Sequence, residues 1–241
     1  MLSALPRAYP ISRLFSAAWN RRILPVPNGE RTARYPDGRK MRLDLSDRTQ
    51  RIMFCNTYEH AETDAASSLL RPGDVLVDAG AHVGWYTILA ARKIGTDGHV
   101  YAFEPDPDNY QLLAQNVRLN QLENVSLAQV ALHSEAGSVS VGRQSDSGSI
   151  TARPVARQHV ETVIAETLDR TVPEVPVRLL KIDVEGLEPE VIKGGTGVLS
   201  RTEHVLVETN QHSDTETRFA LELAGFRLIR TLSRMNALFG R

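Results

Sequence analysis

The feature that most constrains this chain is an apolar run that ends in an acidic residue and two glycines and leads into an amphipathic segment. It occupies residues 75–95 and reads VLVDAGAHVGWYTILAARKIG. This order is typical of a buried strand, a tight turn and a helix. Gly80 and Gly84 would allow the loop backbone to approach a ligand where free N–H groups favour negative charge. The stretch therefore predicts an α/β fold with a ligand at this loop.

Apolar runs and amphipathic segments alternate from this loop to the end of the chain. We predict strands at residues 75–78, 100–103, 125–130, 177–182, 205–208 and 226–231, with helices at 85–93, 107–120, 189–193 and 216–224. Such alternation indicates a mostly parallel central sheet with helices on both faces, a Rossmann-like architecture. The polar segment 142–157 is expected to be a loop.

Residues 1–57 form an N-terminal extension in this prediction, and residues 58–241 form the main domain. The first 27 residues mix leucine and tryptophan with arginine. They would form an amphipathic helix that packs on the domain, contacts a second copy in a homodimer, or rests on a membrane surface. The turn signal YPDG predicts a hairpin over 32–44, and two helices are expected over 47–55 and 62–70.

Composition excludes several classes of function. The chain has 241 residues and a formal net charge of −1, which gives no electrostatic case for nucleic acid as a partner. Cys55 is the single cysteine. An intrachain disulfide is therefore impossible, which fits a cytoplasmic location. No apolar run reaches the length of a membrane span.

The glycine spacing argues against a dinucleotide cofactor. In the G-x-G-x-x-G fingerprint the positions that begin at Gly80 would be Gly80, His82 and Trp85, and two of these are bulky. The observed pattern is instead Asp78, Gly80 and Gly84. This wider loop suits S-adenosylmethionine, which has no pyrophosphate. Glu104 ends the next strand, where a carboxylate can accept hydrogen bonds from a ribose diol.

Charged residues alternate in the stretch RLLKIDVEGLEPEVIKGG, residues 178–195. Lys181, Asp183 and Glu185 would share one face of an extended chain. Burial of three charges within a sheet would cost several kcal/mol each unless they were paired. We therefore expect them at the carboxyl tip of the strand, where α/β sheets open their ligand crevice. Asp183 or Glu185 is the expected general base, and Lys181 would hold the acidic cluster or the acceptor oxygen.

Together these motifs resemble the FkbM family of S-adenosylmethionine-dependent methyltransferases. The resemblance rests on DAGAHVGWYT, FEPDPDNY, TLD at 167–169 and LLKIDVEGLEPEVIKGG, and it covers roughly residues 58–226. One departure is His82, where the family commonly has asparagine. The resemblance implies a class I methyltransferase fold, S-adenosylmethionine as cofactor, and methyl transfer to a hydroxyl of a sugar, a glycan or a polyketide-like product. The expected cofactor contacts are Tyr58, Glu59, Asp78, Gly80, Ala81, Gly84, Glu104, Pro105, Val130 and Ala131.

Several alternatives remain open at this point. The acceptor could be a carboxyl or nitrogen group, and the chain could also be an NAD-dependent oxidoreductase or an inactive nucleotide-binding scaffold. The histidines show no ligand pair at short spacing, so no metal site is predicted. One weaker arrangement would place Asp183, Glu208 and His212 around a divalent ion.

Overall fold

The computed structural model describes residues 28–143, 150–151, 159–208 and 213–241. The predicted helix within residues 1–27 and most of the predicted loop 142–157 lie outside these ranges, as does His212. Within the described part of the chain, no helix is long and apolar enough to cross a membrane.

A seven-stranded sheet forms the centre of the molecule, in the order β12-β13-β11-β10-β3-β4-β5. Neighbouring strands from β11 to β5 run parallel, and β13 is antiparallel to both β11 and β12. The bounds are β3 Val75–Ala79, β4 His99–Phe103, β5 Val125–Ala128, β10 Val177–Ile182, β11 Thr202–Glu208, β12 Arg227–Thr231 and β13 Asn236–Gly240. The sheet confirms the predicted mostly parallel α/β class, and all six predicted strands are present.

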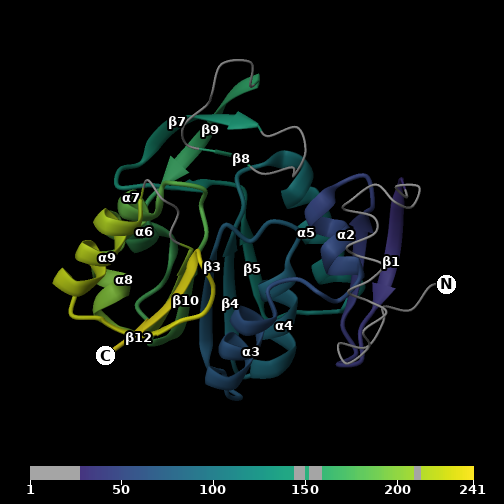
Figure 1. Cartoon of the computed structure of the whole chain (residues 1–241), viewed down its shortest axis with the longest axis horizontal. Coiled ribbons are helices and arrows are strands. Elements are labelled where there is room, and N and C mark those ends of the chain that lie inside the picture. The colour runs from purple at the N-terminus through teal and green to yellow at the C-terminus, as the bar shows by residue number, and fades with distance from the viewer. Residues whose placement is uncertain (1–27, 144–149, 152–158, 209–212) are drawn as a thin grey trace.

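Helices cover both faces of this sheet (Figure 1). The first face carries the hairpin of β1 (Glu30–Arg34) and β2 (Lys40–Asp44), with α2 (Arg48–Phe54), α3 (His60–Leu69), α4 (Trp85–Ile94) and α5 (Pro107–Leu119). The second face carries α6 (Leu168–Thr171), α7 (Glu188–Lys193), α8 (Thr196–Ser200) and α9 (Asp214–Leu223).

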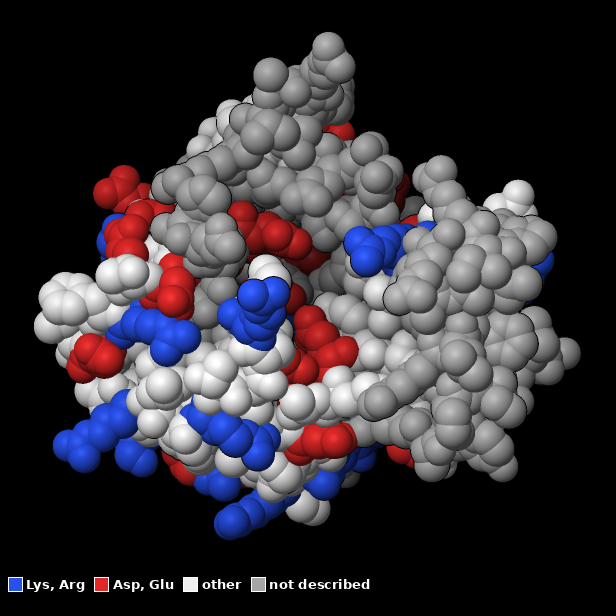
Figure 2. Space-filling view, viewed as in Figure 1, with Lys and Arg blue, Asp and Glu red and all other residues white. Residues whose placement is uncertain are grey.

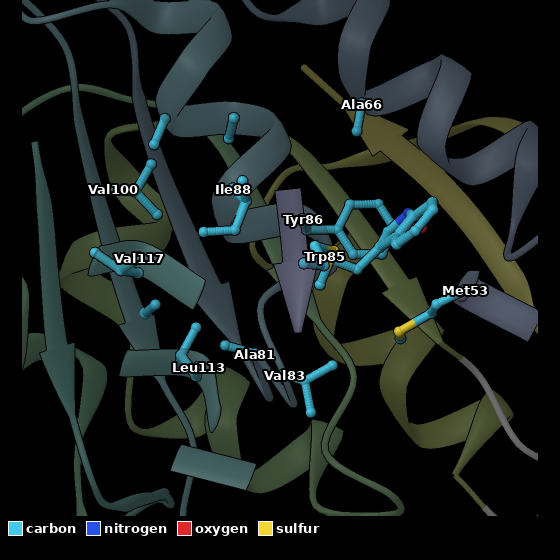
Figure 3. Packing of buried hydrophobic residues seen from close by; sticks show 14 of the residues in the cluster. Met53, Ala66, Ala81, Val83, Trp85, Tyr86, Ile88, Val100, Leu113 and Val117 are labelled. Atoms are coloured by element: carbon cyan, nitrogen blue, oxygen red, sulfur yellow. The ribbon is translucent and has the colours of Figure 1, made fainter. Parts of the chain in front are cut away.

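Alternation along each strand divides the buried side chains between two cores. Leu76 and Leu179 face the first core, whereas their neighbours Val77 and Leu180 face the second. Both strands are buried on both faces, which explains the adjacent apolar residues in each, VLV in β3 and LL in β10. Figure 3 shows the first core, in which side chains of α4 and α5 pack against Val100 of β4.

The predicted hairpin belongs to the first core. The side-chain oxygens of Asn116 on α5 and of Asn120, which caps the C-terminus of α5, accept hydrogen bonds from the backbone N–H groups of Arg42 and Lys40, at 2.6 and 2.9 Å. The two side-chain amides also donate to the carbonyl oxygens of the same two hairpin residues. Helix α5 therefore holds β2 through hydrogen bonds as well as apolar contact, and the hairpin is fixed relative to the sheet.

A second sheet was not predicted. It has the order β6-β9-β7-β8, with β6 Ala131–Leu132, β7 Gly137–Arg143, β8 Ile150–Thr151 and β9 His159–Glu166. Its strands lie beyond the upper ends of the central strands in Figure 1. The expectation of one continuous loop over 142–157 is wrong at residues 142–143 and 150–151, which belong to β7 and β8. Strand β5 also ends two residues earlier than predicted.

Candidate functional site

A cavity of about 450 Å³ lies at the carboxyl ends of β3, β4, β10 and β11. This is the edge at which open α/β sheets bind ligands. The described residues that line it are Arg48, Thr49, Tyr58, Glu59, Gly80, His82, Phe103, Glu104, Pro105, Asn109, Val130, Ala131, Leu132, Val141, Asp183, Val184, Glu185, Leu187, Glu208 and Met235.

Most of the residues expected at the site line this cavity, and four do not. Tyr58, Glu59, Gly80, Glu104, Pro105, Val130, Ala131, Asp183 and Glu185 are among its walls. Asp78, Ala81, Gly84 and Lys181 are at most 5% exposed or, for Gly84, enclosed by neighbouring helices, and they lie behind the walls. These four are placed to support the cavity walls from behind.

The two loop glycines are required by the protein's own packing. Gly80 has a φ of +82°, and a Cβ there would stand 1.8 Å from the carbonyl oxygen of Asp183. Gly84 has a φ of +96°, and its Cβ would stand 2.8 Å from a methyl group of Leu113. Both glycines were expected to let the backbone approach a ligand, but of the two only Gly80 lines the cavity. At both positions a left-handed backbone and a close neighbour exclude larger residues.

Four backbone N–H groups of this loop donate hydrogen bonds within the protein. The N–H groups of Gly80 and Ala81 donate to the carbonyl oxygen of Phe103, and that of Gly84 donates to Ala81. The N–H of His82 donates to the Glu104 carboxylate at 2.8 Å. These donors are already used, so the expectation of an anion site at this loop is wrong at these four residues.

Glu104 stands where the sequence placed it, directly after β4. Its second carboxylate oxygen accepts the N–H of Asp106 at 3.0 Å, and the side chain is 5% exposed. Burial raises the pKa of Glu104 to about 7, although the two backbone hydrogen bonds oppose this. Each oxygen keeps a lone pair, so the carboxylate can accept hydrogen bonds from a ribose diol.

Lys181 lies inside β10 and not at an open tip, which corrects the prediction. It is 5% exposed, and Asp78, opposite it on β3, is fully buried. The Lys181 ammonium lies 3.5 Å from Asp78 and 3.2 Å from Asp183, and it donates to the Gly80 carbonyl at 2.8 Å. Burial alone would lower the pKa of Lys181, but Asp183 and Asp78 raise it. The ammonium therefore holds the acidic cluster and the glycine loop together.

Three carboxylates converge in front of Lys181. Each of Asp183, Glu185 and Glu208 offers one oxygen atom, and these atoms lie within 4.8 Å of one another. The prediction that Glu185 reaches this place along an extended chain is wrong. Strand β10 ends at Ile182, and Glu185 has a left-handed φ of 53°. A divalent cation could be held by three such oxygens.

Glu59 closes the cavity from the start of α3. Its backbone is left-handed, with a φ of 39°, and its carboxylate accepts a hydrogen bond from Tyr86 at 2.6 Å. Burial, and then the charge of Asp183, raise the pKa of Glu59 to about 7. Both Glu59 and Glu104 therefore change charge near neutral pH.

The sequence left the role of His82 open between a cofactor contact and a loop residue without a ligand. It lines the cavity with a left-handed φ of 50°. Its Nε2 is buried and has no hydrogen-bond partner among the described residues. Burial lowers the pKa of His82 to about 4, so the ring is neutral at physiological pH. A neutral ring nitrogen there can donate to or accept from a ligand.

The charge of the cavity discriminates between cofactors. Its described walls contain five carboxyl groups and one arginine, Arg48, and acidic side chains gather near the middle of this face (Figure 2). A pyrophosphate would be repelled by this arrangement, whereas the sulfonium and ammonium groups of S-adenosylmethionine would be attracted. Apolar walls at Phe103, Val130 and Leu132 suit an adenine ring. The residues present therefore fit S-adenosylmethionine.

Replacement of Glu104 by glutamine gives a first test of this assignment. Affinity of the wild-type protein for S-adenosylhomocysteine is expected to rise with pH through 7, because the ionised carboxylate is the form that accepts the ribose hydroxyls. In Glu104→Gln, affinity should fall by roughly tenfold, the cost of about one such charged hydrogen bond. The pH dependence of the affinity should become shallower, since Glu59 is then the one that remains of the two cavity residues with a pKa of about 7. Calorimetric titrations at pH 6, 7 and 8 measure both effects.

The same variant has an internal control for folding. The pKa of Glu104 is raised from 4.5 in the folded protein, so ionisation destabilises the ligand-free fold as pH rises towards 7. Glu104→Gln removes this charge but keeps only one acceptor oxygen for the two backbone N–H groups, so its melting temperature should depend less on pH between 5 and 8 than that of the wild type. A variant that is unfolded at these pH values and therefore binds no ligand would show a structural role only.

The sheet order, the acidic residue after β4 and the acidic cluster after β10 together define a class I methyltransferase fold. The model for the methyltransferase FkbM domain matches residues 78–228. The chain belongs to this family, and the assignment confirms the predicted fold class and the predicted cofactor, S-adenosylmethionine.

Individual relatives agree with the family. A hexuronic acid methyltransferase, AglP of Haloferax volcanii, is 30% identical over 144 residues, which are 58% of each protein. Methyltransferase 1 of Beauveria bassiana is 27% identical and matches 49% of this chain and 57% of its own length. The chain thus spans less than three fifths of the length of these curated relatives.

Two solved structures share the fold. The FkbM methyltransferase of Methylobacillus flagellatus has a TM-score of 0.52 at 15% identity, over 80% of this chain and 54% of its own. An S-adenosylmethionine-dependent O-methyltransferase of Thermotoga maritima has a TM-score of 0.50 at 15% identity, over 87% of this chain and 76% of its own.

Proposed function

We propose that this protein transfers a methyl group from S-adenosylmethionine to a hydroxyl oxygen of a sugar or glycan. The observation that carries the proposal is the cavity at the strand ends, whose described walls contain five carboxyl groups. S-adenosylmethionine supplies an activated methyl group. The protein must then align the acceptor and take up its proton, and alignment alone can contribute several kcal/mol.

Asp183 is the proposed proton acceptor, and Glu185 is the second candidate. Burial would raise the pKa of Asp183, but Lys181 and Glu208 together lower it, so this carboxylate is ionised at neutral pH. It lines the cavity and can therefore accept a hydrogen bond from an acceptor hydroxyl. Lys181 fixes its orientation from behind, at 3.2 Å.

The same charges favour a hydroxyl over a carboxylate acceptor. An alcohol must lose a proton when its oxygen is methylated, which a nearby carboxylate assists. A carboxylate acceptor has no proton to lose and would be repelled by the acidic cluster. The sugar class is supported by the relative that is named a hexuronic acid methyltransferase. An amine acceptor remains the second candidate, because the acidic cavity would attract its cationic form.

An acceptor assay with two product classes tests the proposal. We expect labelled methyl to pass from S-adenosylmethionine to neutral hexoses or glycans, and the product to survive mild alkali as an ether. Glucuronate serves as the matched acceptor because it offers both hydroxyl and carboxyl oxygens. Alkali-labile label on glucuronate, with none on the neutral sugar, would show ester formation and contradict the hydroxyl assignment.

A further inference from the structure

A second cavity, of about 410 Å³, lies between α3, α4 and the turn that joins β1 to β2. Helices α3 and α4 lie side by side on the first face of the sheet (Figure 1). The polar residues that line this cavity, among those described, are Asp37 and Arg39 from the turn, Thr63 and Ser67 from α3, and Arg92 and Lys93 from α4. None of them lines the first cavity, at the strand ends.

Arg39 places a buried positive charge at the second cavity in a fixed orientation. Its side chain is 2% exposed, and its guanidinium carbon lies 5.0 Å from the centroid of the Tyr35 ring and 4.5 Å from that of Trp85. The Nε of Arg39 donates to the Asp37 carboxylate at 2.7 Å, and one terminal nitrogen donates to the Trp85 carbonyl at 3.4 Å. Because the guanidinium is already oriented, an anion that binds beside it has little side-chain ordering to overcome.

Arg92 and Lys93 add two exposed positive charges to the same cavity. Neither forms an ion pair with any residue in the part of the chain that the structure describes. Both lie in the last turn of α4, where the helix dipole favours cations. The dipole does not account for the buried Arg39 that faces the same space. Three cationic side chains and one carboxylate, that of Asp37, leave an excess of two positive charges around the cavity.

We propose that the second cavity is a binding site for a phosphate group. A phosphate monoester carries about two negative charges at neutral pH and three acceptor oxygens, which match this excess. Arginine and lysine are the usual donors to phosphate, and the hydroxyl of Ser67 offers a further hydrogen bond. A carboxylate would neutralise only one of the two charges. The volume lies within the range of small-molecule sites, so the cavity has room for the organic part of a phosphorylated sugar.

Trp85 separates the two cavities. Its ring lies beneath Arg39, and it also contacts the Tyr58 ring edge to face, with 5.6 Å between the centroids. Tyr58 lines the first cavity. A phosphate group beside Arg39 therefore leaves the first cavity open, and the phosphate ligand and S-adenosylhomocysteine should bind at the same time.

Calorimetric titration of the full-length protein with glucose 6-phosphate, at saturating S-adenosylhomocysteine, tests the site. We expect one molecule to bind, and we expect no binding of glucose. The double variant Arg92→Gln/Lys93→Gln should lower the affinity by roughly 10- to 100-fold, as expected for the loss of one or two charged hydrogen bonds. Arg118→Gln/Arg227→Gln is the matched control, because it removes two exposed positive charges that do not line the cavity. It should bind as the wild type does, and melting temperatures verify that both variants are folded.

Inorganic phosphate in the same titration distinguishes the source of the phosphate group. Weaker binding than that of glucose 6-phosphate would identify a phosphorylated small molecule as the ligand, and equal binding would identify free phosphate. Absence of binding by both compounds would overturn the proposal. So would displacement of glucose 6-phosphate by S-adenosylhomocysteine, or an equal loss of affinity in the control variant. No turnover is measured, so the result does not depend on the proposed methyl transfer.

Discussion

Replacement of Asp183 by asparagine is expected to lower kcat by about 10²- to 10⁴-fold, the range that a positioned base contributes. Asparagine keeps the size of the side chain but cannot take up the acceptor proton. Of the two acidic residues that pair with Lys181, only Asp78 then keeps its charge. Affinity for S-adenosylhomocysteine should change much less, because that ligand carries no sulfonium charge. Initial rates at saturating cofactor and calorimetric titration measure the two quantities.

Asp97→Asn is the matched control, since Asp97 is exposed and lies away from the cavity. It should leave both quantities at wild-type values. Glu185→Gln tests the second candidate base in the same assay. If Asp183→Asn folds and keeps near-normal kcat while Glu185→Gln loses it, the proton acceptor is Glu185. If both variants keep it, neither carboxylate is the base.

Gly80→Ala is expected to abolish cofactor binding and to destabilise the protein by several kcal/mol. A left-handed backbone costs an alanine roughly 1–2 kcal/mol, and overpacking adds about 1–3 kcal/mol. The new Cβ would meet the Asp183 carbonyl at 1.8 Å, so the loop or the end of β10 must move. Either movement displaces the carboxylates that form the cavity. Thermal unfolding and titration with S-adenosylhomocysteine measure the effects.

Gly73→Ala separates the steric effect from the backbone effect. Gly73 has a φ of +86°, close to that of Gly80, but a Cβ there would have nothing within 4 Å. This control should lose only about 1–2 kcal/mol and bind ligand as the wild type does. Equal losses in the two variants would mean that the contact between the loop and β10 contributes little.

Most strands of the central sheet could be predicted because they contain short apolar runs, such as VLV in β3, VYAF in β4 and VLV in β11. Strands β3 and β10 are buried on both faces, and adjacent apolar residues in a segment this short are typical of a buried strand and not of a helix. Strand β13 was missed because it pairs within an antiparallel hairpin and follows no helix. Strands β7 and β9 alternate between small polar and apolar residues, and their pairing across a polar connection is a long-range contact that no local pattern encodes.

At the site, local sequence identified the residues but not always their roles. Asp183 and Glu104 follow strands and line the cavity as expected. Asp78 was expected to contact the cofactor, and Lys181 was expected to hold either the acidic cluster or the acceptor oxygen. The two side chains pair with each other across β3 and β10, and Lys181 also holds Asp183. Glu208 could be considered only as part of a weak metal site, since its contact with Asp183 depends on the register of two strands that are distant in sequence. Register is set by packing of the whole sheet.

The most direct test of the central claim is a calorimetric titration of the full-length protein with S-adenosylhomocysteine, with NAD as the parallel ligand. An acidic cavity at the ends of β3, β4, β10 and β11 predicts one binding site for S-adenosylhomocysteine and no detectable binding of NAD. Binding of NAD in preference, or no binding of S-adenosylhomocysteine, would contradict the assignment of this cavity as the cofactor site.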